Sequence, residues 1–232
     1  MISLGLIPAR YGSSRFPGKP LADINGKSMI QRVFEQAKKS DLDHVVVATD
    51  DHRIFDTVVK FGGQAIMTST NHQCGTDRCV EALEKISIKS DLVVNIQGDE
   101  PFIQPQQINL VLGAFQKIET PIVTLAKTID NEDLKNPNVV KVFFDDLRFA
   151  NSFQRKVLLN STCEKHIGIY GFKTDVIKEV SQLTPSKLEI EHRLEQWRWL
   201  QNDYPIYVAK TDSDCYSVDT PQDLEKIRRM NF

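Results

Sequence analysis

Three cations and several small residues follow the first apolar run of the sequence. Residues 2–7 lead into the loop Pro8-Ala9-Arg10-Tyr11-Gly12-Ser13-Ser14-Arg15-Phe16-Pro17-Gly18-Lys19-Pro20. Small residues let a backbone approach a ligand closely, arginine binds phosphate oxygens in pairs, and lysine adds a point charge. The loop contains neither the dinucleotide-binding glycine fingerprint nor a Walker sequence. Arg10, Arg15 and Lys19 therefore predict a triphosphate site, with a solvated surface loop as the alternative.

Two carboxylates stand at comparable places further along the chain. Asp99 lies in Asn95-Ile96-Gln97-Gly98-Asp99-Glu100-Pro101, and Asp219 lies in Ser217-Val218-Asp219-Thr220-Pro221. A carboxylate that faces a phosphate loop is repelled unless a cation lies between them, and Mg²⁺ binds one or two carboxylates together with substrate phosphates. Asp99 therefore predicts a Mg²⁺ site or, alternatively, a helix N-cap. Asp219 predicts either a Mg²⁺ ligand or part of a helix-capping motif.

A weaker candidate is the segment Cys74-Gly75-Thr76-Asp77-Arg78. Gly75 would permit close approach of a ligand at the start of a helix, and Arg78 would lie one turn further on. Taken alone, the pattern is little more than an N-cap with a surface arginine.

Alternating strands and helices must position these residues. In the first half of the chain, apolar periodicity predicts helices at 28–39, 51–61, 76–87 and 105–117. Short β-branched or apolar runs predict strands at 2–7, 44–48, 64–67 and 92–96. This order predicts an α/β fold with a largely parallel, doubly wound sheet, in which ligands bind at the carboxyl ends of the strands.

The pattern changes after about residue 120. Strands are expected at 122–129, 139–144, 166–172 and 205–209, and helices at 173–181, 187–201 and 221–230. With no repeat and no Gly/Ser linker, we expect a single domain over 1–232. Its mixed sheet would carry an inserted β-rich lobe at about 122–172.

Composition excludes several classes of protein. The 232 residues include 29 Lys and Arg and 31 Asp and Glu, for a net charge of −2, so neither a basic nucleic-acid-binding protein nor an acidic disordered tail is expected. No apolar run reaches the roughly 18 residues of a membrane span, and no signal peptide is recognisable. The four cysteines make no disulfide framework and are expected to be reduced. We therefore expect a cytoplasmic protein without nucleic-acid or membrane partners.

Taken together, the motifs resemble the 3-deoxy-manno-octulosonate (Kdo) cytidylyltransferases. The matching stretches are IPARYGSSRFPGKPL at 7–21, CGTDR at 74–78, NIQGDEP at 95–101, KHIGIYGF at 165–172 and VDTPQDL at 218–224, with LEQWRWL at 194–200 as a looser match. The first stretch alone is typical of nucleotide-sugar pyrophosphorylases in general, and the others narrow the resemblance to this family.

The resemblance implies a Rossmann-like nucleotide-diphospho-sugar transferase fold, a Mg²⁺ cofactor and a homodimer. It also implies a reaction in which CTP and Kdo, an acidic eight-carbon sugar, give CMP-Kdo and pyrophosphate for lipopolysaccharide synthesis. One alternative is a cytidylyltransferase for another acid sugar, such as 8-amino-Kdo or a sialic-acid-like compound. The other is a non-catalytic nucleotide-binding homologue.

Roles carried over from the family fall on matching positions of this sequence. Residues implied to hold the triphosphate are Arg10, Ser13, Arg15 and Lys19. Those implied to lie by the cytidine are Cys74, Gly75 and Arg78. Asp99 and Asp219 would bind Mg²⁺ and, with Arg10 and Lys19, form the catalytic set. Residues implied to line the sugar pocket are Gln97, His166, Tyr170, Glu195 and Gln196.

One segment departs from the family pattern. The family carries Tyr-Phe-Ser-Arg-x-x-Ile-Pro and then a loop of over a dozen residues, whereas this chain has Phe149 to Leu159 and only six residues before His166. Arg155 is predicted to replace the motif's arginine as a substrate-binding residue. The shortened 149–165 segment predicts a looser or altered sugar site and an altered dimer contact, with the loss of a dispensable surface loop as the alternative. No general base stands out, and His166 is as well suited to hydrogen bonding with the sugar.

Overall fold

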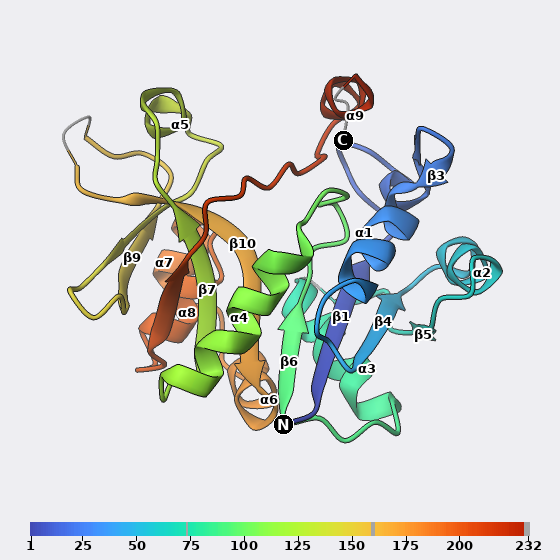
Figure 1. Cartoon of the computed structure of the whole chain (residues 1–232), viewed down its shortest axis with the longest axis horizontal. Coiled ribbons are helices and arrows are strands. Elements are labelled where there is room, and N and C mark those ends of the chain that lie inside the picture. The colour runs from blue at the N-terminus through green and yellow to red at the C-terminus, as the bar shows by residue number, and fades with distance from the viewer. Residues whose placement is uncertain (73, 159–160, 230–232) are drawn as a thin grey trace. The chain divides into compact units, whose positions relative to one another are not determined.

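The computed structural model describes residues 1–72, 74–158 and 161–229 (Figure 1). The chain forms two compact units, one made of Met1–Asn109 with Cys215–Phe232 and the other of Leu110–Asp214. The first unit contains every residue predicted to bind triphosphate, cytidine or metal. The second contains most of the predicted sugar residues. That the whole chain acts as a single cytidylyltransferase domain stays a prediction.

A parallel sheet with the strand order β6-β1-β4-β5 forms the centre of the first unit. The strands are β1 (Ser3–Ala9), β4 (His44–Thr49), β5 (Ala65–Met67) and β6 (Leu92–Asn95). All of β6 is buried, as expected for an apolar run covered on both faces. The four predicted strands are confirmed to within two residues at each end. Because the strands are parallel, the loops that follow them leave the same edge of the sheet.

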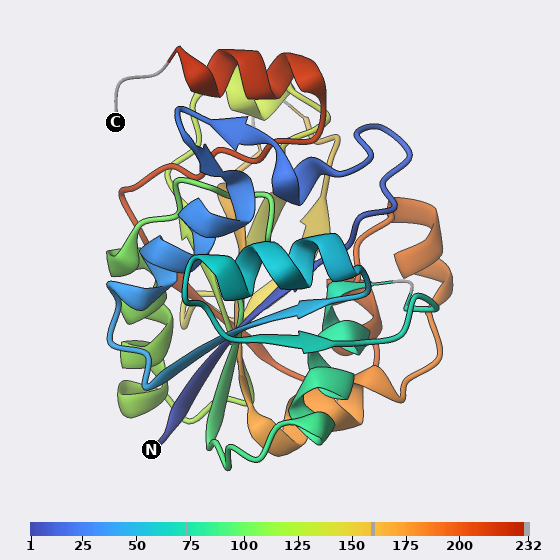
Figure 2. The ribbon, with the colours of Figure 1, turned by 90° about the vertical axis from the view of Figure 1, so that its right-hand side faces the viewer.

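Helices flank this sheet and begin at recognisable caps. They are α1 (Met29–Lys38), α2 (His52–Lys60), α3 (Gly75–Lys85), the first part of α4 (Pro105–Lys117) and α9 (Pro221–Arg228). The side chains of Ser28 and Asp51 accept hydrogen bonds from backbone amides in the first turns of α1 and α2. Helix α2 runs alongside β4 and β5 (Figure 2). The predicted helices at these positions are confirmed.

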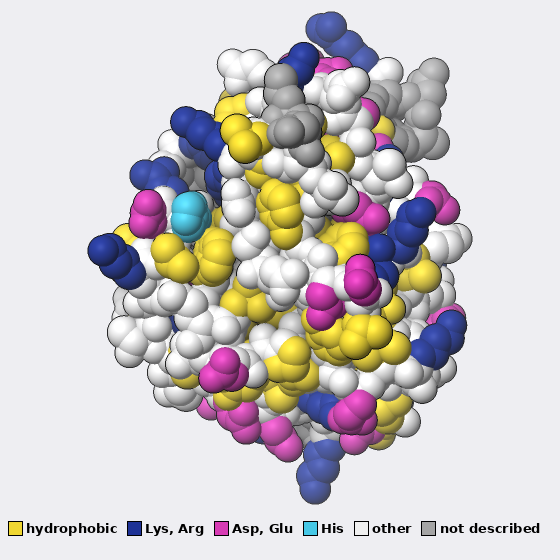
Figure 3. All heavy atoms as spheres, turned by 90° about the vertical axis from the view of Figure 1, so that its left-hand side faces the viewer, with side chains coloured by type: hydrophobic (Ala, Val, Ile, Leu, Met, Phe, Trp, Pro, Cys, Tyr) yellow, Lys and Arg dark blue, Asp and Glu magenta, His cyan; other side chains and the backbone are white. Residues whose placement is uncertain are grey.

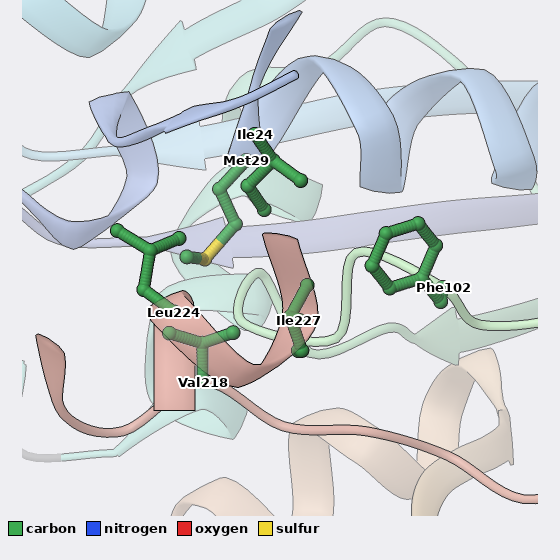
Figure 4. Close-up of a cluster of buried hydrophobic side chains, with 6 residues drawn as sticks. All are labelled: Ile24, Met29, Phe102, Val218, Leu224 and Ile227. Atoms are coloured by element: carbon green, nitrogen blue, oxygen red, sulfur yellow. The ribbon is translucent and has the colours of Figure 1, made fainter. Parts of the chain in front are cut away.

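After β1 the chain forms a short 3-10 helix, η1 (Lys19–Leu21), and then a small hairpin of β2 (Asp23–Ile24) and β3 (Lys27–Ser28). A separate hydrophobic cluster joins α9 to this hairpin. Figure 4 shows its six side chains, Ile24, Met29, Phe102, Val218, Leu224 and Ile227. Val218 is fully buried, and its amide donates to the Asp99 carbonyl at 2.9 Å. This packing holds the chain beside Asp219 against the loop that carries Asp99.

The second unit has a mixed sheet. Its strands are β7 (Ile122–Lys127), β8 (Lys141–Phe144), β9 (Ala150–Gln154), β10 (Glu164–Lys173) and β11 (Ile206–Lys210). β11 pairs with β7 in parallel, and the β7–β10, β10–β8 and β8–β9 pairs are antiparallel. Its short helices are α5 (Asn131–Lys135), α6 (Thr174–Ser181), α7 (Lys187–His192) and α8 (Gln196–Leu200). The predicted mixed, mostly parallel α/β fold is confirmed.

One expectation for the second unit was wrong, and one strand was missed. The helix predicted over 187–201 is two helices, because Arg193 adopts a left-handed conformation (φ 54°) that ends α7. Strand β9 was not foreseen, because only Ala150 and Phe153 of its five residues are buried apolar side chains. Within the described ranges, no helix is long and apolar enough to cross a membrane.

Candidate active site

A cavity of about 370 Å³ opens at the carboxyl edge of the parallel sheet in the first unit. Its walls come from the loop after β1, the loop after β6, the start of α3 and the turn before α9. Ten predicted residues line it: Arg10, Ser13, Arg15, Lys19, Cys74, Gly75, Arg78, Gln97, Asp99 and Asp219. The structure thus brings together the whole predicted triphosphate, cytidine and metal set.

Lys19 links the two predicted metal-binding carboxylates. Its Nζ lies 2.7 Å from Asp99 Oδ2 and 3.4 Å from Asp219 Oδ1, and Arg15 donates to the same Asp219 oxygen at 2.9 Å. The Lys19 side chain is only 14% exposed, so its ammonium is enclosed between the carboxylates. Two carboxylates from distant parts of the sequence therefore converge on one cation.

The capping alternatives for these aspartates are resolved by the local structure. Thr220, not Asp219, caps α9: its hydroxyl accepts from the Asp223 amide at 3.2 Å, and Asp223 reaches back to the Thr220 amide at 2.9 Å. Asp99 lies in a turn after β6 and caps no helix. Both carboxylates are left to face the cavity. Their carboxylate oxygens surround the position of the Lys19 ammonium. Mg²⁺ prefers such hard oxygen ligands, so these two residues fit a magnesium site.

The loop after β1 is held by its own backbone. The Gly18 and Ser13 amides both donate to the Tyr11 carbonyl, at 2.9 and 3.0 Å, and Gly18 adopts a left-handed conformation (φ 71°). The Ser13 hydroxyl accepts from the Phe16 amide at 3.3 Å. Ser13 therefore shapes the loop as well as lining the cavity.

Arg10 is an exposed cation of the cavity wall. In the described parts of the chain its guanidinium has no hydrogen-bond or ion-pair partner, whereas Arg15 and Lys19 each contact a carboxylate. Arg10→Ala should therefore weaken CTP binding by about 1–3 kcal/mol, the value of a charge-assisted contact, without lowering stability. Calorimetric titration with Mg·CTP and a thermal melt measure both effects. Unchanged CTP affinity would remove Arg10 from the triphosphate site.

Arg78 is buried and is anchored within the protein. Its side chain is 3% exposed and donates to Asp50 Oδ2 at 2.8 Å, Thr68 Oγ1 at 2.6 Å and the Ser69 carbonyl at 3.2 Å. Asp50 in turn accepts from the Tyr11 amide at 3.3 Å. Arg78 therefore ties the start of α3 to the loops after β1, β4 and β5, a positioning role that the sequence did not indicate.

The start of α3 is compact. Cys74 is the N-cap, and its Sγ accepts from the Asp77 amide at 3.4 Å. A Cβ on Gly75 would come within 3.3 Å of Pro8 Cγ. Gln97 donates weakly to Asn95 Oδ1 at 3.5 Å. The close approach of Pro8 accounts for the glycine at position 75, and close approach of a ligand there stays a prediction.

Glu100 is a buried carboxyl beside the cavity, and no ligand role was predicted for it. The Cys215 thiol donates to its Oε2 at 2.8 Å. Burial raises the pKa of Glu100 from 4.5 to about 7, the Cys215 contact opposes this, and the Asp99 charge adds to it. Glu100 therefore binds a proton more tightly in the folded protein than in the unfolded chain.

The stability of the protein should depend on pH through Glu100. Because its folded pKa lies above its unfolded value, its contribution is fully present below pH 4.5 and is lost as pH rises through about 7. Glu100→Gln, which imitates the protonated acid, should match wild type at about pH 5 and exceed it at about pH 8. Urea unfolding at both values measures the difference. An equal gain at both would contradict the assignment.

Three of the predicted sugar residues of the second unit, His166, Tyr170 and Gln196, form a hydrogen-bonded chain. His166 Nε2 lies 2.9 Å from the Thr124 hydroxyl and 3.0 Å from the Tyr170 hydroxyl, and the Gln196 amide donates to the same Tyr170 oxygen. Burial lowers the pKa of His166 to about 3, so the imidazole is neutral and a poor base. Gln196 Oε1 is buried without a hydrogen-bond partner among the described residues.

The remaining predicted residues are less informative. Arg155 follows β9 and donates to the Asn138 carbonyl at 3.2 Å, while its own carbonyl accepts from the buried Lys141 at 2.9 Å. Glu195 is the N-cap residue of α8, but its side chain makes no capping hydrogen bond. Residues 159–160 of the shortened segment lie outside the described residues. Substrate roles for Arg155 and Glu195 stay predictions.

His72 was not predicted as a site residue, yet it lines the cavity. Its partner Glu81 lies nine positions away on α3. No local pattern links two residues at that spacing, because one belongs to a loop and the other to a helix.

Comparison with known proteins identifies the family of this chain. The cytidylyltransferase family model matches residues 4–212. A 3-deoxy-manno-octulosonate cytidylyltransferase of Parabacteroides distasonis is 49% identical over 96% of this chain and 95% of its own. A mitochondrial one of Arabidopsis thaliana is 44% identical over 98% of this chain and 82% of its own.

A solved structure is similar over nearly the whole chain. It is a CMP:2-keto-3-deoxy-manno-octonic acid synthetase complexed with CTP, with a TM-score of 0.92 and 40% identity, covering 98% of this chain and 97% of its own. The two chains therefore agree in sequence and fold over almost their full lengths. This chain belongs to the 3-deoxy-manno-octulosonate cytidylyltransferase family.

Proposed function

We propose that this protein transfers the cytidylyl group of CTP to Kdo and releases pyrophosphate. The observation that carries the proposal is the cavity in which Asp99 and Asp219 converge on Lys19, with Arg10 and Arg15 in the same wall. Relatives that share 44–49% of their residues with this chain are named for this reaction. The activated sugar would serve lipopolysaccharide synthesis.

The residues of the cavity divide the work of binding a triphosphate. Arg10 and Arg15 offer guanidinium groups to phosphate oxygens, and Lys19 exchanges its carboxylate partners for a phosphate when the nucleotide binds. Asp99 and Asp219 are then available to hold Mg²⁺. When bound there, Mg²⁺ would neutralise phosphate charge and acidify the sugar hydroxyl.

In the proposed step, the anomeric hydroxyl oxygen of Kdo forms a bond to the α-phosphorus. The bond between that phosphorus and the oxygen bridging to the β-phosphate breaks, pyrophosphate leaves with that electron pair, and the hydroxyl proton passes to solvent. The barrier is mostly alignment and charge repulsion, which fixed cations lower. The neutral His166 and the unpartnered Gln196 Oε1 would hydrogen-bond the sugar and do not remove its proton.

Pyrophosphate release from CTP, Mg²⁺ and Kdo tests the proposal directly. Parallel reactions with 8-amino-Kdo and N-acetylneuraminate separate the acid-sugar alternatives by kcat/KM. High efficiency with Kdo alone would show that the shortened 149–165 segment leaves sugar specificity intact. Nucleotide binding without release from any of the three sugars would favour the non-catalytic alternative.

A homodimer and a cytoplasmic location belong to the same proposal. Three large apolar side chains of the second unit are exposed: Leu147 at 73%, Leu158 at 76% and Ile190 at 67%. Figure 3 shows hydrophobic side chains gathered near the middle of one molecular face, the kind of surface that marks an interface. All four cysteines are described and none forms a disulfide, which suits a reducing compartment. Sedimentation at micromolar concentration tests the dimer, and a monomer would contradict it.

A further inference from the structure

Tyr11 is the residue around which residues 8–20, the triphosphate loop, fold back on themselves. Its carbonyl accepts from the Ser13 and Gly18 amides at 3.0 and 2.9 Å, and its own amide donates to Asp50 Oδ1 at 3.3 Å. A Cβ on Gly18 would come within 3.1 Å of the Tyr11 ring, so the ring lies directly against that glycine. The backbone and the side chain of Tyr11 therefore both shape the loop that carries the predicted triphosphate cations.

Arg53, in the first turn of α2, covers the aromatic ring of Tyr11. Its Cζ lies 3.3 Å from the ring centroid, a separation at which a guanidinium stacks flat on a ring. Asp51 holds this guanidinium along one edge, because Arg53 Nε donates to Asp51 Oδ1 at 2.9 Å and Nη2 donates to Oδ2 at 2.7 Å. Asp51 is itself fixed as the N-cap of α2, where it accepts from the Arg53 amide at 2.9 Å.

Two consecutive aspartates after β4 thus support the two parts of Tyr11. Asp50 accepts from its amide, and Asp51 acts on its ring through Arg53. Helix α2 also packs beside η1, which carries Lys19 (Figure 2). Neither Tyr11 nor Arg53 is among the described residues that line the cavity. The start of α2 therefore supports the triphosphate loop from outside the cavity.

The triphosphate loop has few other contacts to hold it. Between residues 10 and 19, every side chain is exposed or only partly buried. Segments with few buried contacts open at a small cost in free energy, so each remaining contact changes how often the loop is closed. The affinity for a ligand that needs the closed loop falls with the fraction of molecules in which the loop is closed.

We propose that Arg53 is a positioning residue for triphosphate binding, which keeps the triphosphate loop closed through Tyr11 and does not itself contact the phosphates. The inference rests on the proposed function, because it takes this loop as the site of the triphosphate. Arginine suits the role better than lysine, since an ammonium group has no flat face to stack on a ring and cannot bind a carboxylate at two points.

Amide hydrogen exchange of the nucleotide-free protein tests the positioning role. The Gly18 amide is protected while it donates to the Tyr11 carbonyl, so its exchange rate reports opening of the loop. Arg53→Ala keeps the backbone amide that Asp51 caps and removes only the exposed side chain. It should raise the Gly18 exchange rate about two- to fivefold, the value of an exposed cation–aromatic contact. An unchanged rate would overturn the proposal.

Lys60→Ala is the matched control for the loss of charge. Lys60 is an exposed cation in the last turn of α2, about 10 Å further along the helix than Arg53. This variant should leave both the Gly18 exchange rate and the affinity for CTP as in wild type. An equal effect of Lys60→Ala and Arg53→Ala would assign the change to net charge and overturn the role of the stacked ring.

Calorimetric titration with Mg·CTP, without sugar, measures the consequence for the nucleotide. Arg53→Ala should weaken CTP binding about two- to fivefold, by a similar factor at low and at high salt, because loop closure needs no long-range attraction. An arginine that paired with the phosphates would lose its effect at high salt, since salt screens exposed charges. A loss confined to low salt, with unchanged Gly18 exchange, would place Arg53 on the phosphates and contradict the proposal.

Substitutions at Tyr11 separate the ring from the charge. Tyr11→Leu keeps an apolar side chain against Gly18 but offers no aromatic face, so adding Arg53→Ala should have no further effect on Gly18 exchange or CTP affinity. Tyr11→Phe keeps the ring and should keep the full effect of Arg53→Ala, which provides a test even where Tyr11→Leu does not fold. Additive effects of Tyr11→Leu and Arg53→Ala, or no effect of Arg53→Ala beside Tyr11→Phe, would overturn the proposal.

The experiments also distinguish this inference from the proposed function. If wild type neither binds CTP nor releases pyrophosphate, the proposed function fails, and the exchange of Gly18 in the free protein still decides whether Arg53 holds the loop. Normal CTP binding by wild type, combined with unchanged exchange and affinity in Arg53→Ala, is a failure of this inference alone.

Discussion

Asp99→Asn and Asp219→Asn should each lower cytidylyl transfer by at least about 100-fold while leaving the fold intact. Both carboxylates face the cavity beside the Lys19 ammonium, and neither caps a helix. An amide keeps the shape of the side chain but loses the charge that a divalent cation requires. Steady-state pyrophosphate release measures the loss, and titration with Mn²⁺ in the presence of CTP measures the change in metal affinity.

Asp56→Asn provides the matched control, because the same chemical change falls on an exposed residue of α2 outside the cavity. It should retain wild-type turnover. All three variants should unfold within about 1 kcal/mol of wild type, since partly exposed ion pairs contribute little to stability. Near wild-type turnover in both cavity variants would contradict the assignment of Asp99 and Asp219 as metal ligands.

Gly98→Ala should destabilise the protein by about 2–3 kcal/mol and weaken nucleotide binding at the same time. A Cβ at this buried position would lie 2.6 Å from the Pro8 carbonyl oxygen, and a backbone atom cannot swing aside as a flexible side chain would. Relief requires the loop after β6 to move away from the end of β1, where the triphosphate loop begins. Those loops carry Lys19 and Asp99, so the strain reaches the site directly. Urea unfolding and CTP titration measure the two effects.

Gly113→Ala is the corresponding control. Gly113 lies inside α4, and a Cβ there would meet no atom within 4 Å. Alanine is the better helix former, so this variant should gain about 0.5–1 kcal/mol. If Gly98→Ala were as harmless as Gly113→Ala, the close approach of the two loops would not be a structural requirement.

The parallel half of the fold was predictable because its signals are strong and local. Buried β-branched runs such as Val45-Val46-Val47 and helices with apolar stripes left little ambiguity. The site residues followed from the same pattern, since carboxyl ends of parallel strands meet at one edge. The triphosphate and metal roles were predicted from residue type and position, whereas the cytidine and sugar roles came from family resemblance.

The remainder depended on tertiary contacts that the sequence does not display. Strand β9 is stabilised by pairing with β8, not by its own composition. The break at Arg193 depends on a left-handed residue that is not glycine, and Glu189 then joins α7 to α8 by accepting from Arg198 at 2.6 Å. The Arg78–Asp50 and His72–Glu81 contacts likewise join residues whose spacing carries no signal.

The pairing of charges around the cavity has a kinetic consequence. Lys19 and Arg15 are offset by Asp99 and Asp219, and Arg78 is offset by Asp50. Among the described residues lining the cavity, this leaves Arg10 as the cation with no partner. Long-range attraction of an anionic nucleotide scales with uncompensated charge, and salt screens it over roughly 10 Å at 0.1 M. The association rate of Mg·CTP should therefore change little with ionic strength, so capture of the nucleotide relies on contacts made after encounter.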